Sequence, residues 1–178
     1  MIYVKFSSPI NPQTAQNLMN FLIDRINLGE KEFYFLISSP GGTVNDGVVL
    51  YNFIKALPVK IVMHNIGIID SIANVVFLSS PERYCTPNSS FLFHGVGFDI
   101  IQPQRLDEKE LREKLLVIER DQKSIAGIIS ERTKLTEENV MEMFFRAKTK
   151  NPIEAKDIGM VHEIKAVNIP ENAKIFSL

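Results

Sequence analysis

The sequence contains little of several residue types and patterns that mark specialised classes of protein. Its 178 residues include one cysteine and no tryptophan, and 20 Lys and Arg nearly balance 21 Asp and Glu, for a formal net charge of -1. The single cysteine, Cys85, excludes an internal disulfide framework and a four-thiolate zinc site. The balanced charge argues against nucleic-acid and anionic-membrane partners, which require a basic surface to neutralise phosphates.

Long hydrophobic runs are missing as well. No apolar segment approaches the roughly 20 residues that cross a bilayer, and the N-terminus runs into a strand pattern without the basic segment of a secretory signal. The length suits one domain of ordinary size, and 45% hydrophobic residues are enough to form its core. We therefore expect a single cytoplasmic globular domain with no metal or other cofactor.

The first half of the chain alternates apolar, strand-like runs with segments of helical spacing. Strands are expected at residues 2–6, 33–37, 59–63, 84–85 and 91–93. Helices are expected from Pro12 to Gly29, from Val44 to Pro58 and from Ser71 to Ser79. This alternation is typical of βαβ units, so we expect an α/β fold with a largely parallel sheet.

The second half is dominated by one long amphipathic helix, expected over residues 107–132. One side of it carries the apolar residues Leu111, Leu115, Ile118, Ile125 and Ile129. A helix of this length cannot be fully buried in a small domain, so it packs on a partner or protrudes. A helix after Thr136, another from Pro152 to Gly159 and a last strand at 160–164 complete the expected elements.

Two turns could supply parts of a catalytic site. The segment from Ser39 to Thr43 contains Pro40, Gly41 and Gly42 between a strand and a helix, and free N–H groups there would suit an oxyanion hole. The alternative is an ordinary loop.

Ser71 falls at the first residues of an apolar helix, beside the amide of Ile72, where a hydroxyl lies near the positive end of the helix dipole. The alternative there is a simple helix cap.

His94 is the third candidate, because it follows a buried strand directly and precedes Gly95. A histidine at the end of a strand can reach a neighbouring strand end as a general base. His64 and His162 lie within strand patterns instead, so we expect them to be structural.

Taken in order, these segments resemble the ClpP family, the proteolytic subunit of the ATP-dependent Clp protease. The similarity begins at residues 1–6, is densest at 83–89 and continues through the long "handle" helix to residues 154–161. It implies a ClpP/crotonase-like spiral of ββα units, with a head of residues 1–94 and 133–178 and a handle of residues 95–132. It also implies heptameric rings, usually stacked in pairs as a tetradecamer around a chamber in which polypeptides are degraded.

The resemblance also assigns roles to individual residues of a serine endopeptidase. Ser71 matches the nucleophile and His94 its base, and the amides of Gly42 and Ile72 match the oxyanion hole. An extended substrate would pair with the backbone on two sides. Those two segments are Pro40, Gly41 and Thr43 on one side, and Gly95, Val96 and the residues up to Ile100 on the other.

The chain also departs from the family pattern. Ala147 stands where the triad aspartate belongs, and alanine can neither orient nor charge-stabilise His94. Asn151 ranks first as a substitute, ahead of Asp157 and Asp70, and the alternative is that no orienting residue exists. A carboxylate at Asp70, beside the nucleophile, would disfavour the alkoxide and the oxyanion.

A second departure concerns partners. The chain begins at its first strand, without the family's axial-loop segment that helps to dock a Clp-type ATPase unfoldase. That partnership is therefore left open.

Three hypotheses compete. The first is a ClpP-like serine endopeptidase with an altered third triad member, and the second is a non-catalytic or impaired structural subunit that assembles into rings. The third is a crotonase-type acyl-CoA enzyme, because that superfamily shares the spiral core and an oxyanion hole. Ser71 and His94 argue against the third, since crotonases typically use carboxylates and need no serine nucleophile.

Overall fold

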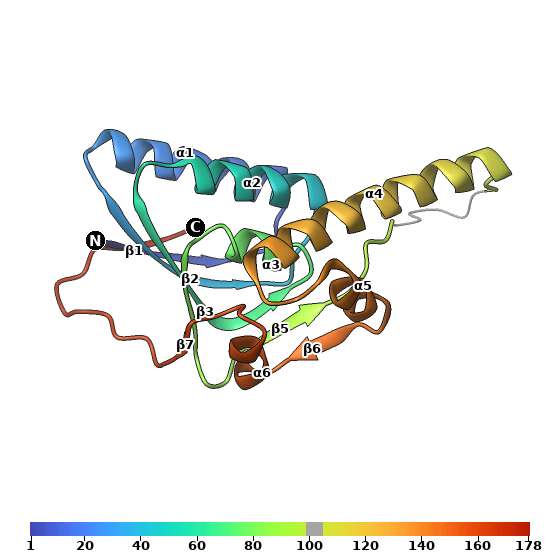
Figure 1. The fold of residues 1–178 in the computed structure, drawn as a ribbon. Coiled ribbons are helices and arrows are strands. Elements are labelled where there is room, and N and C mark those ends of the chain that lie inside the picture. The colour runs from blue at the N-terminus through green and yellow to red at the C-terminus, as the bar shows by residue number, and fades with distance from the viewer. Residues whose placement is uncertain (99–104) are drawn as a thin grey trace.

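The computed structural model describes residues 1–98 and 105–178, which fold around one eight-stranded sheet (Figure 1). Its strands are β1 (Ile2–Ser7), β2 (Glu32–Ser39), β3 (Lys60–Asp70), β4 (Glu82–Cys85), β5 (Ser90–Phe93), β6 (Lys148–Lys150), β7 (Glu163–Ile164) and β8 (Ile175–Ser177). Their order is β6-β5-β3-β2-β1-β8, and β4 pairs with β3 and β7. Among these pairs only β5 with β6 is antiparallel, so the expected α/β fold with a largely parallel sheet is confirmed.

Strand β3 is long because it pairs with two strands along one edge. Its residues 62–65 lie beside β4 and its residues 68–70 lie beside β5, while its other edge pairs with β2. The sequence analysis ended this strand at Met63, which is wrong. His64 and Asn65 interrupt the apolar run, but both side chains are buried within the continuing strand.

Helices α1 (Pro12–Asn27), α2 (Val44–Ala56) and α3 (Ala73–Phe77) form a layer on one face of the sheet, where α1 and α2 lie side by side (Figure 1). α1 begins as the sequence predicts: Asn11 and Thr14 form a reciprocal capping box, and Pro12 occupies the first turn. Buried side chains from both layers form the core. They include Phe6, Phe33 and Phe35 from the sheet and Leu18, Leu22 and Leu50 from the helices.

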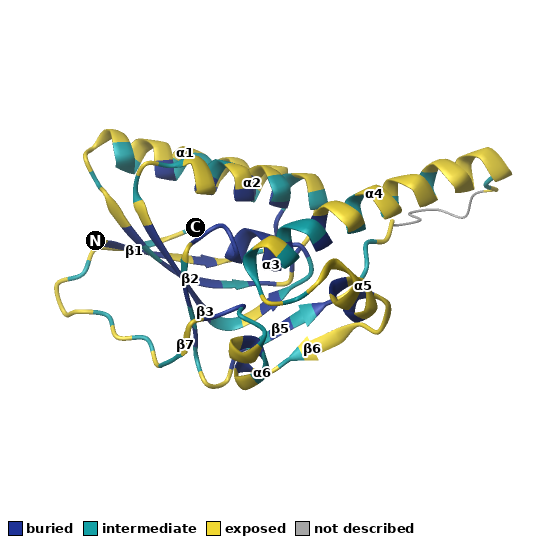
Figure 2. Ribbon diagram, viewed as in Figure 1, coloured by how far each residue is buried: buried dark blue, intermediate teal, exposed yellow. Residues whose placement is uncertain are grey.

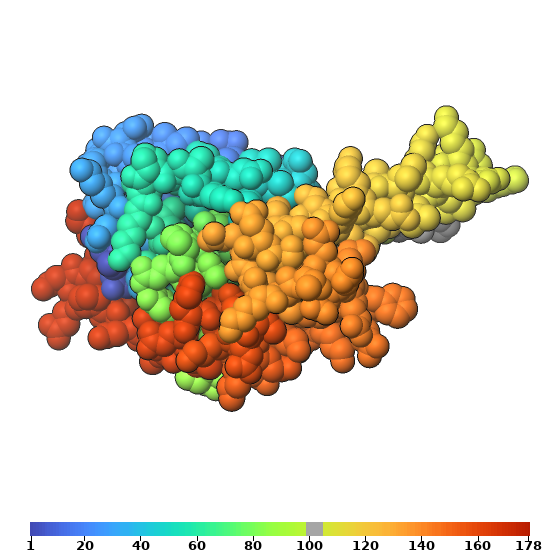
Figure 3. Space-filling model, viewed as in Figure 1, coloured from blue at the N-terminus to red at the C-terminus, as the bar shows by residue number. Residues whose placement is uncertain are grey.

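Helix α4 (Glu108–Arg132) extends away from this body as an arm, which Figure 3 shows in space-filling form. Only its base is packed, through Ile125, Ala126 and Ile129, and its outer half is exposed (Figure 2). Leu111 and Leu115 are 49% and 54% exposed. The predicted apolar stripe is therefore divided into a buried part at the head and an exposed part on the arm.

Most of the remaining elements lie near the edge of the sheet formed by β6, whereas β8 pairs with β1 at the opposite edge. Helix α5 (Glu137–Phe145) leads into β6, and helix α6 (Pro152–Asp157) follows it. The predicted last strand at 160–164 is reduced to β7, and the short strands β6 and β8 were not predicted. None of the helices within residues 1–98 and 105–178 is both long and apolar enough to span a membrane.

Candidate active site

Ser71 lies in a strained turn between the end of β3 and the start of α3. Its φ of 56° is in the left-handed region, which few residues other than glycine adopt. The turn is held by hydrogen bonds from the Ser71 N–H to the Leu92 carbonyl (2.9 Å) and from the Asn74 N–H to the Ser71 carbonyl (3.1 Å). A serine on a sharp strand-to-helix turn of this kind presents its hydroxyl at the end of the sheet, as a nucleophile requires.

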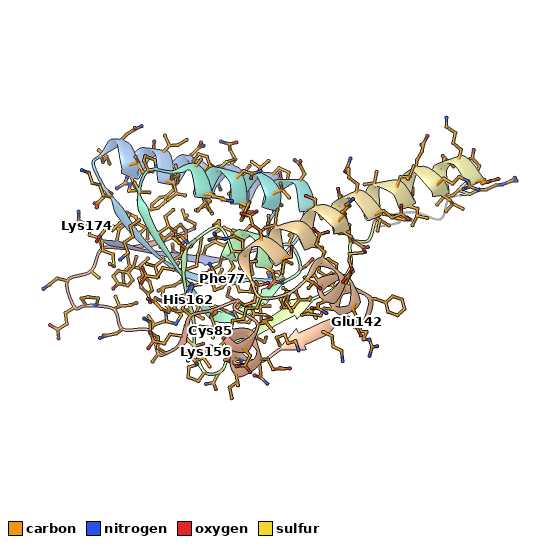
Figure 4. The ribbon with its side chains drawn as sticks, viewed as in Figure 1. Phe77, Cys85, Glu142, Lys156, His162 and Lys174 are labelled. Carbon is orange, nitrogen blue, oxygen red and sulfur yellow. The ribbon has the colours of Figure 1, made fainter. Side chains whose placement is uncertain are left out.

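Asn74 fastens this turn to β5. Its Nδ2 donates to the carbonyls of Ser71 (3.0 Å) and Leu92 (2.8 Å), and its side chain is almost fully buried. Phe77 of α3, labelled in Figure 4, adds an edge-to-face contact with Phe91 of β5, at 5.4 Å between ring centroids. This structural role of Asn74 was not predicted from the sequence. The signal that could have indicated it is a single amide side chain inside an otherwise apolar helix.

The glycine turn packs directly against the serine turn. Gly41 has a φ of 85°, and a Cβ there would lie 2.6 Å from the Asp70 carbonyl oxygen and 2.8 Å from the Ser71 Cβ. Gly42 forms a parallel β-bridge with Ile10. The Ile10 N–H donates to the Gly41 carbonyl, and the Thr43 N–H donates to the Ile10 carbonyl, both at 2.8 Å. A Cβ on Gly42 would overlap the Ile10 carbonyl oxygen. Neither position can accept a side chain without moving backbone.

Two amides in these turns have no hydrogen-bond acceptor. Neither the Gly42 N–H nor the Ile72 N–H donates to any residue in the described part of the chain. The Ile72 nitrogen would be 3.3 Å from a Cβ on Gly41, so the two turns bring their amides to the same region beside Ser71. Paired free N–H groups can stabilise the oxyanion of an acyl-transfer reaction.

His94 follows β5 immediately and is exposed. Its Nδ1 lies 2.9 Å from the carbonyl oxygen of Gly95. Because a carbonyl can only accept, Nδ1 carries the proton and Nε2 is left free to accept one. No hydrogen bond joins the Ser71 hydroxyl to His94 or to another residue that the structure describes. Catalytic hydrogen bonds often form only when substrate is present.

Ala147 and His94 lie directly beyond the end of the β5–β6 ladder. The last antiparallel pair there is Phe93 with Lys148, and His94 and Ala147 are the next residues outward on the two segments. Ala147 is exposed and has a φ of 47°. An alanine at this position offers no carboxylate to the imidazole.

Asn151 is not placed to orient His94, contrary to its ranking from the sequence. Asn151 lies four residues after Ala147, toward the other end of the β5–β6 ladder. At the rise of a strand, four residues separate Asn151 from Ala147 by about 13 Å. Its Oδ1 accepts the Glu154 N–H (3.0 Å) and its own N–H donates to the Glu154 carboxylate (3.0 Å), so the side chain caps α6. Asp157 lies still farther along, at the end of α6.

Asp70 is the carboxylate that the structure brings into this region. It is part-buried, and its position in β3 pairs with Leu92 of β5. Burial raises the pKa of Asp70 above its ordinary value, and the Leu92 backbone N–H and the charge of His94 both act against that rise.

A cavity of about 850 Å³ opens beside the glycine turn, between the start of α1 and the arm, and Ser71, Ile72 and His94 do not line it. Its lining includes Thr43 and Val96 of the predicted substrate-binding residues and Gly42 of the predicted oxyanion hole, together with Val117 and Ile118 of α4. The other predicted substrate-binding residues, Pro40, Gly41 and Gly95, adjoin these but do not line the cavity. Residues 99–100 of the predicted substrate-binding segment lie outside the described residues.

The site offers no arrangement of side chains suited to a metal ion. In the part of the chain that the structure describes, no three His, Cys, Asp or Glu side chains gather closely enough to hold one.

The arrangement defines an α/β protein with a serine on a strained turn, a histidine on the adjacent strand and a protruding helical arm. The same fold occurs in a point mutant of ClpP1 from Listeria monocytogenes, with a TM-score of 0.82 at 22% identity over 93% of this chain and 91% of that one. It also occurs in the ClpP protease catalytic domain from Plasmodium falciparum, with a TM-score of 0.75 at 23% identity over 96% and 88%.

The chain belongs to the Clp protease family, whose family model matches residues 2–168. Similar sequences include ATP-dependent Clp protease proteolytic subunit 3 of Rhizobium etli, 28% identical over 88% of this chain and 79% of that protein. Proteolytic subunit 2 of Pseudomonas aeruginosa is 26% identical over 87% and 76%. The predicted resemblance is confirmed, and the crotonase hypothesis is set aside at the level of the family.

Proposed function

We propose that the protein is a ClpP-like serine endopeptidase that cleaves peptides or unfolded polypeptides inside an oligomeric chamber. Ser71 is the nucleophile, His94 is its base, and the third triad member is altered. The observation that carries this proposal is the strained turn at Ser71, which lies against two unpaired amides in the described residues. A turn that served only to connect a strand to a helix would need neither the strain nor the free donors.

The reaction is acyl transfer in two stages. His94 Nε2 accepts the Ser71 proton as Oγ bonds to the substrate carbonyl carbon, and the Gly42 and Ile72 amides hold the resulting oxyanion. The imidazolium then gives its proton to the leaving amine, the peptide C–N bond breaks, and an acyl-enzyme remains. Water, deprotonated by His94, releases the acyl group by the same route. Backbone groups of residues 40–43 and 95–98 hold the substrate extended across the cavity.

The proposal predicts that Ser71 is the one serine phosphonylated by a fluorophosphonate probe, with loss of fluoride. Ser71→Ala should abolish both labelling and peptidase activity, whereas Ser130→Ala should retain them, because the Ser130 hydroxyl only bonds to a carbonyl within α4. Peptide-mass mapping of the adduct measures this. Peptidase activity that persists in Ser71→Ala would remove Ser71 from the mechanism.

A second candidate, a non-catalytic ring subunit, is favoured by one observation: Ala147, just beyond the ladder end next to His94, offers no carboxylate. Loss of correct histidine orientation costs about four orders of magnitude in a serine protease. Intact rings of the purified chain that take up no probe at Ser71 would support this alternative over the first.

Assembly is part of the same proposal. Heptameric rings, stacked in pairs through the exposed half of α4, would enclose the chamber. A Clp-type ATPase partner is not part of the proposal, because no feature of the described residues argues for its docking.

A further inference from the structure

The absent triad carboxylate would have done two things for His94. In serine proteases the aspartate fixes the tautomer and direction of the imidazole, and it stabilises the imidazolium that forms during the reaction. Ala147 can do neither. The groups that do surround His94 therefore decide whether the pair works.

A backbone carbonyl meets the first need. The hydrogen bond from His94 Nδ1–H to the Gly95 oxygen, at 2.9 Å, assigns the tautomer that leaves Nε2 free to act as a base. Gly95 lies close to the arm, because a Cβ on it would be 2.7 Å from Nε2 at the flexible end of the Gln122 side chain on α4. This carbonyl is neutral, however, so it supplies little charge to an imidazolium.

The strand register brings a carboxylate to the same face as His94. Asp70 and Leu92 are partners in the parallel pair of β3 and β5. Phe91 and Phe93 are fully buried on the core face, so Leu92 and, continuing the alternation, His94 face the other way. Asp70 follows the fully buried Ile69 and faces that same side. Diagonal neighbours of this kind on adjacent strands are about 7 Å apart.

We propose that Asp70 is a positioning residue that divides the work of the missing triad aspartate with the Gly95 carbonyl. The carbonyl sets the tautomer, and the Asp70 carboxylate supplies the negative charge that stabilises the imidazolium formed when His94 takes the Ser71 proton. This inference rests on the proposed serine-peptidase function.

The electrostatics of the site agree with this division. Asp70 forms no ion pair with a Lys or Arg among residues 1–98 and 105–178, so no nearer cation there neutralises it. Attraction to His94 opposes the burial that raises the pKa of Asp70. A part-buried carboxylate is less screened than one on the surface, so its charge acts over a longer distance.

The test compares Asp70→Asn with Asp157→Asn, which removes a carboxylate from the exposed end of α6. In Asp70→Asn we expect kcat to fall roughly three- to tenfold with little change in KM. The acid limb of the pH profile should also move to lower pH by about half a unit, because the imidazolium loses its counter-charge. Asp157→Asn should change neither. Ala147→Asp, combined with Asp70→Asn, should restore kcat, since aspartate tolerates the left-handed backbone of position 147.

An unchanged or higher kcat in Asp70→Asn, with the acid limb unmoved, would overturn the proposal and would mean that the carboxylate opposes the oxyanion instead. A second measurement does not depend on activity. In His94→Gln the pKa of Asp70 should rise further, as followed by isotope-edited infrared titration of the carboxyl group; an unchanged pKa would equally overturn the proposal. If Ser71 takes up no probe but this coupling is present, the peptidase proposal fails while the pairing of Asp70 with His94 stands.

Discussion

His64 is a buried histidine held on both sides by hydrogen bonds. The Tyr34 hydroxyl lies 2.8 Å from Nδ1 and the Lys165 carbonyl lies 3.1 Å from Nε2. The carbonyl can only accept, so Nε2 carries the proton and Nδ1 accepts from Tyr34. Burial, aided by the charge of Lys165, lowers the pKa of His64, against the opposing effects of the Lys165 hydrogen bond and of Glu163. The structure therefore joins β2, β3 and the C-terminal segment through a neutral imidazole.

This arrangement predicts a loss of stability in mild acid. In the unfolded chain His64 is protonated near its ordinary pKa of 6.5, whereas in the folded chain it is protonated only at lower pH. Between these two pKa values the unfolded state binds more protons than the folded state does. The His64 contribution is fully present above about pH 6.5 and is lost as pH falls toward the folded pKa. Urea unfolding at about pH 7.5 and about pH 5.5 should show a smaller pH dependence in His64→Gln than in the wild type. Equal pH dependence in both would contradict the assignment.

Single residues also show what the sequence could and could not predict about the site. The motif order predicted Ser71, His94 and the glycine turn as site residues, because each stands at a junction between elements that local patterns reveal, and their catalytic roles stay predictions. Asn151 was ranked first because a loop could bring it toward His94, but β6 leads the chain away from His94. The direction of a three-residue strand is a tertiary property, and no local pattern encodes it.

At the scale of elements, helix starts were the most predictable features. The capping residues Asn11, Thr136 and Asn151 each form a reciprocal capping box, and their chemistry is visible in the sequence. The strands that were missed, β6 and β8, are three residues long, too short to show alternation. Long-range pairing creates them.

Helix α4 offers a test of local helix energetics at Gly127. A Cβ there would meet only Glu137 Oε1, at 3.8 Å, which is an ordinary contact. Gly127→Ala should therefore raise the free energy of unfolding by about 0.5–1 kcal/mol, because alanine is the better helix former. Chemical denaturation measures the change. Destabilisation would show that the base of the arm is packed more tightly than this contact indicates.

For the whole molecule, the divided stripe on α4 leads to a prediction about assembly. Leu111 and Leu115 are exposed together with the neighbouring Leu116, at 64%, and Val117, at 46%. An apolar surface of this kind on an isolated arm is a liability unless a second copy covers it through a two-fold contact. The sequence predicted the stripe, but only the folded head shows that Ile125 and Ile129 are used internally.

Leu115→Glu or Ile118→Lys should accordingly split paired rings and lower activity by loosening the segment beside His94. Arg120→Glu, which places its charge about half a turn around the helix, should leave the rings paired. Sedimentation velocity distinguishes the species. A wild-type chain that sediments as a monomer at micromolar concentration would defeat the assembly proposal.

The position of Ala147 has an evolutionary consequence. It lies exposed beside an edge strand, apart from the buried side chains on which folding depends. Gly41, by contrast, lies in the turn that interlocks with Ser71, where a Cβ would meet the Asp70 carbonyl oxygen and the Ser71 Cβ. Replacement at position 147 removes no core contact, so its cost to stability is limited to how well the new residue fits the left-handed backbone there. The residue type at position 147 is therefore less constrained by folding than the turns around Ser71 are, and selection on turnover is what would hold a carboxylate there.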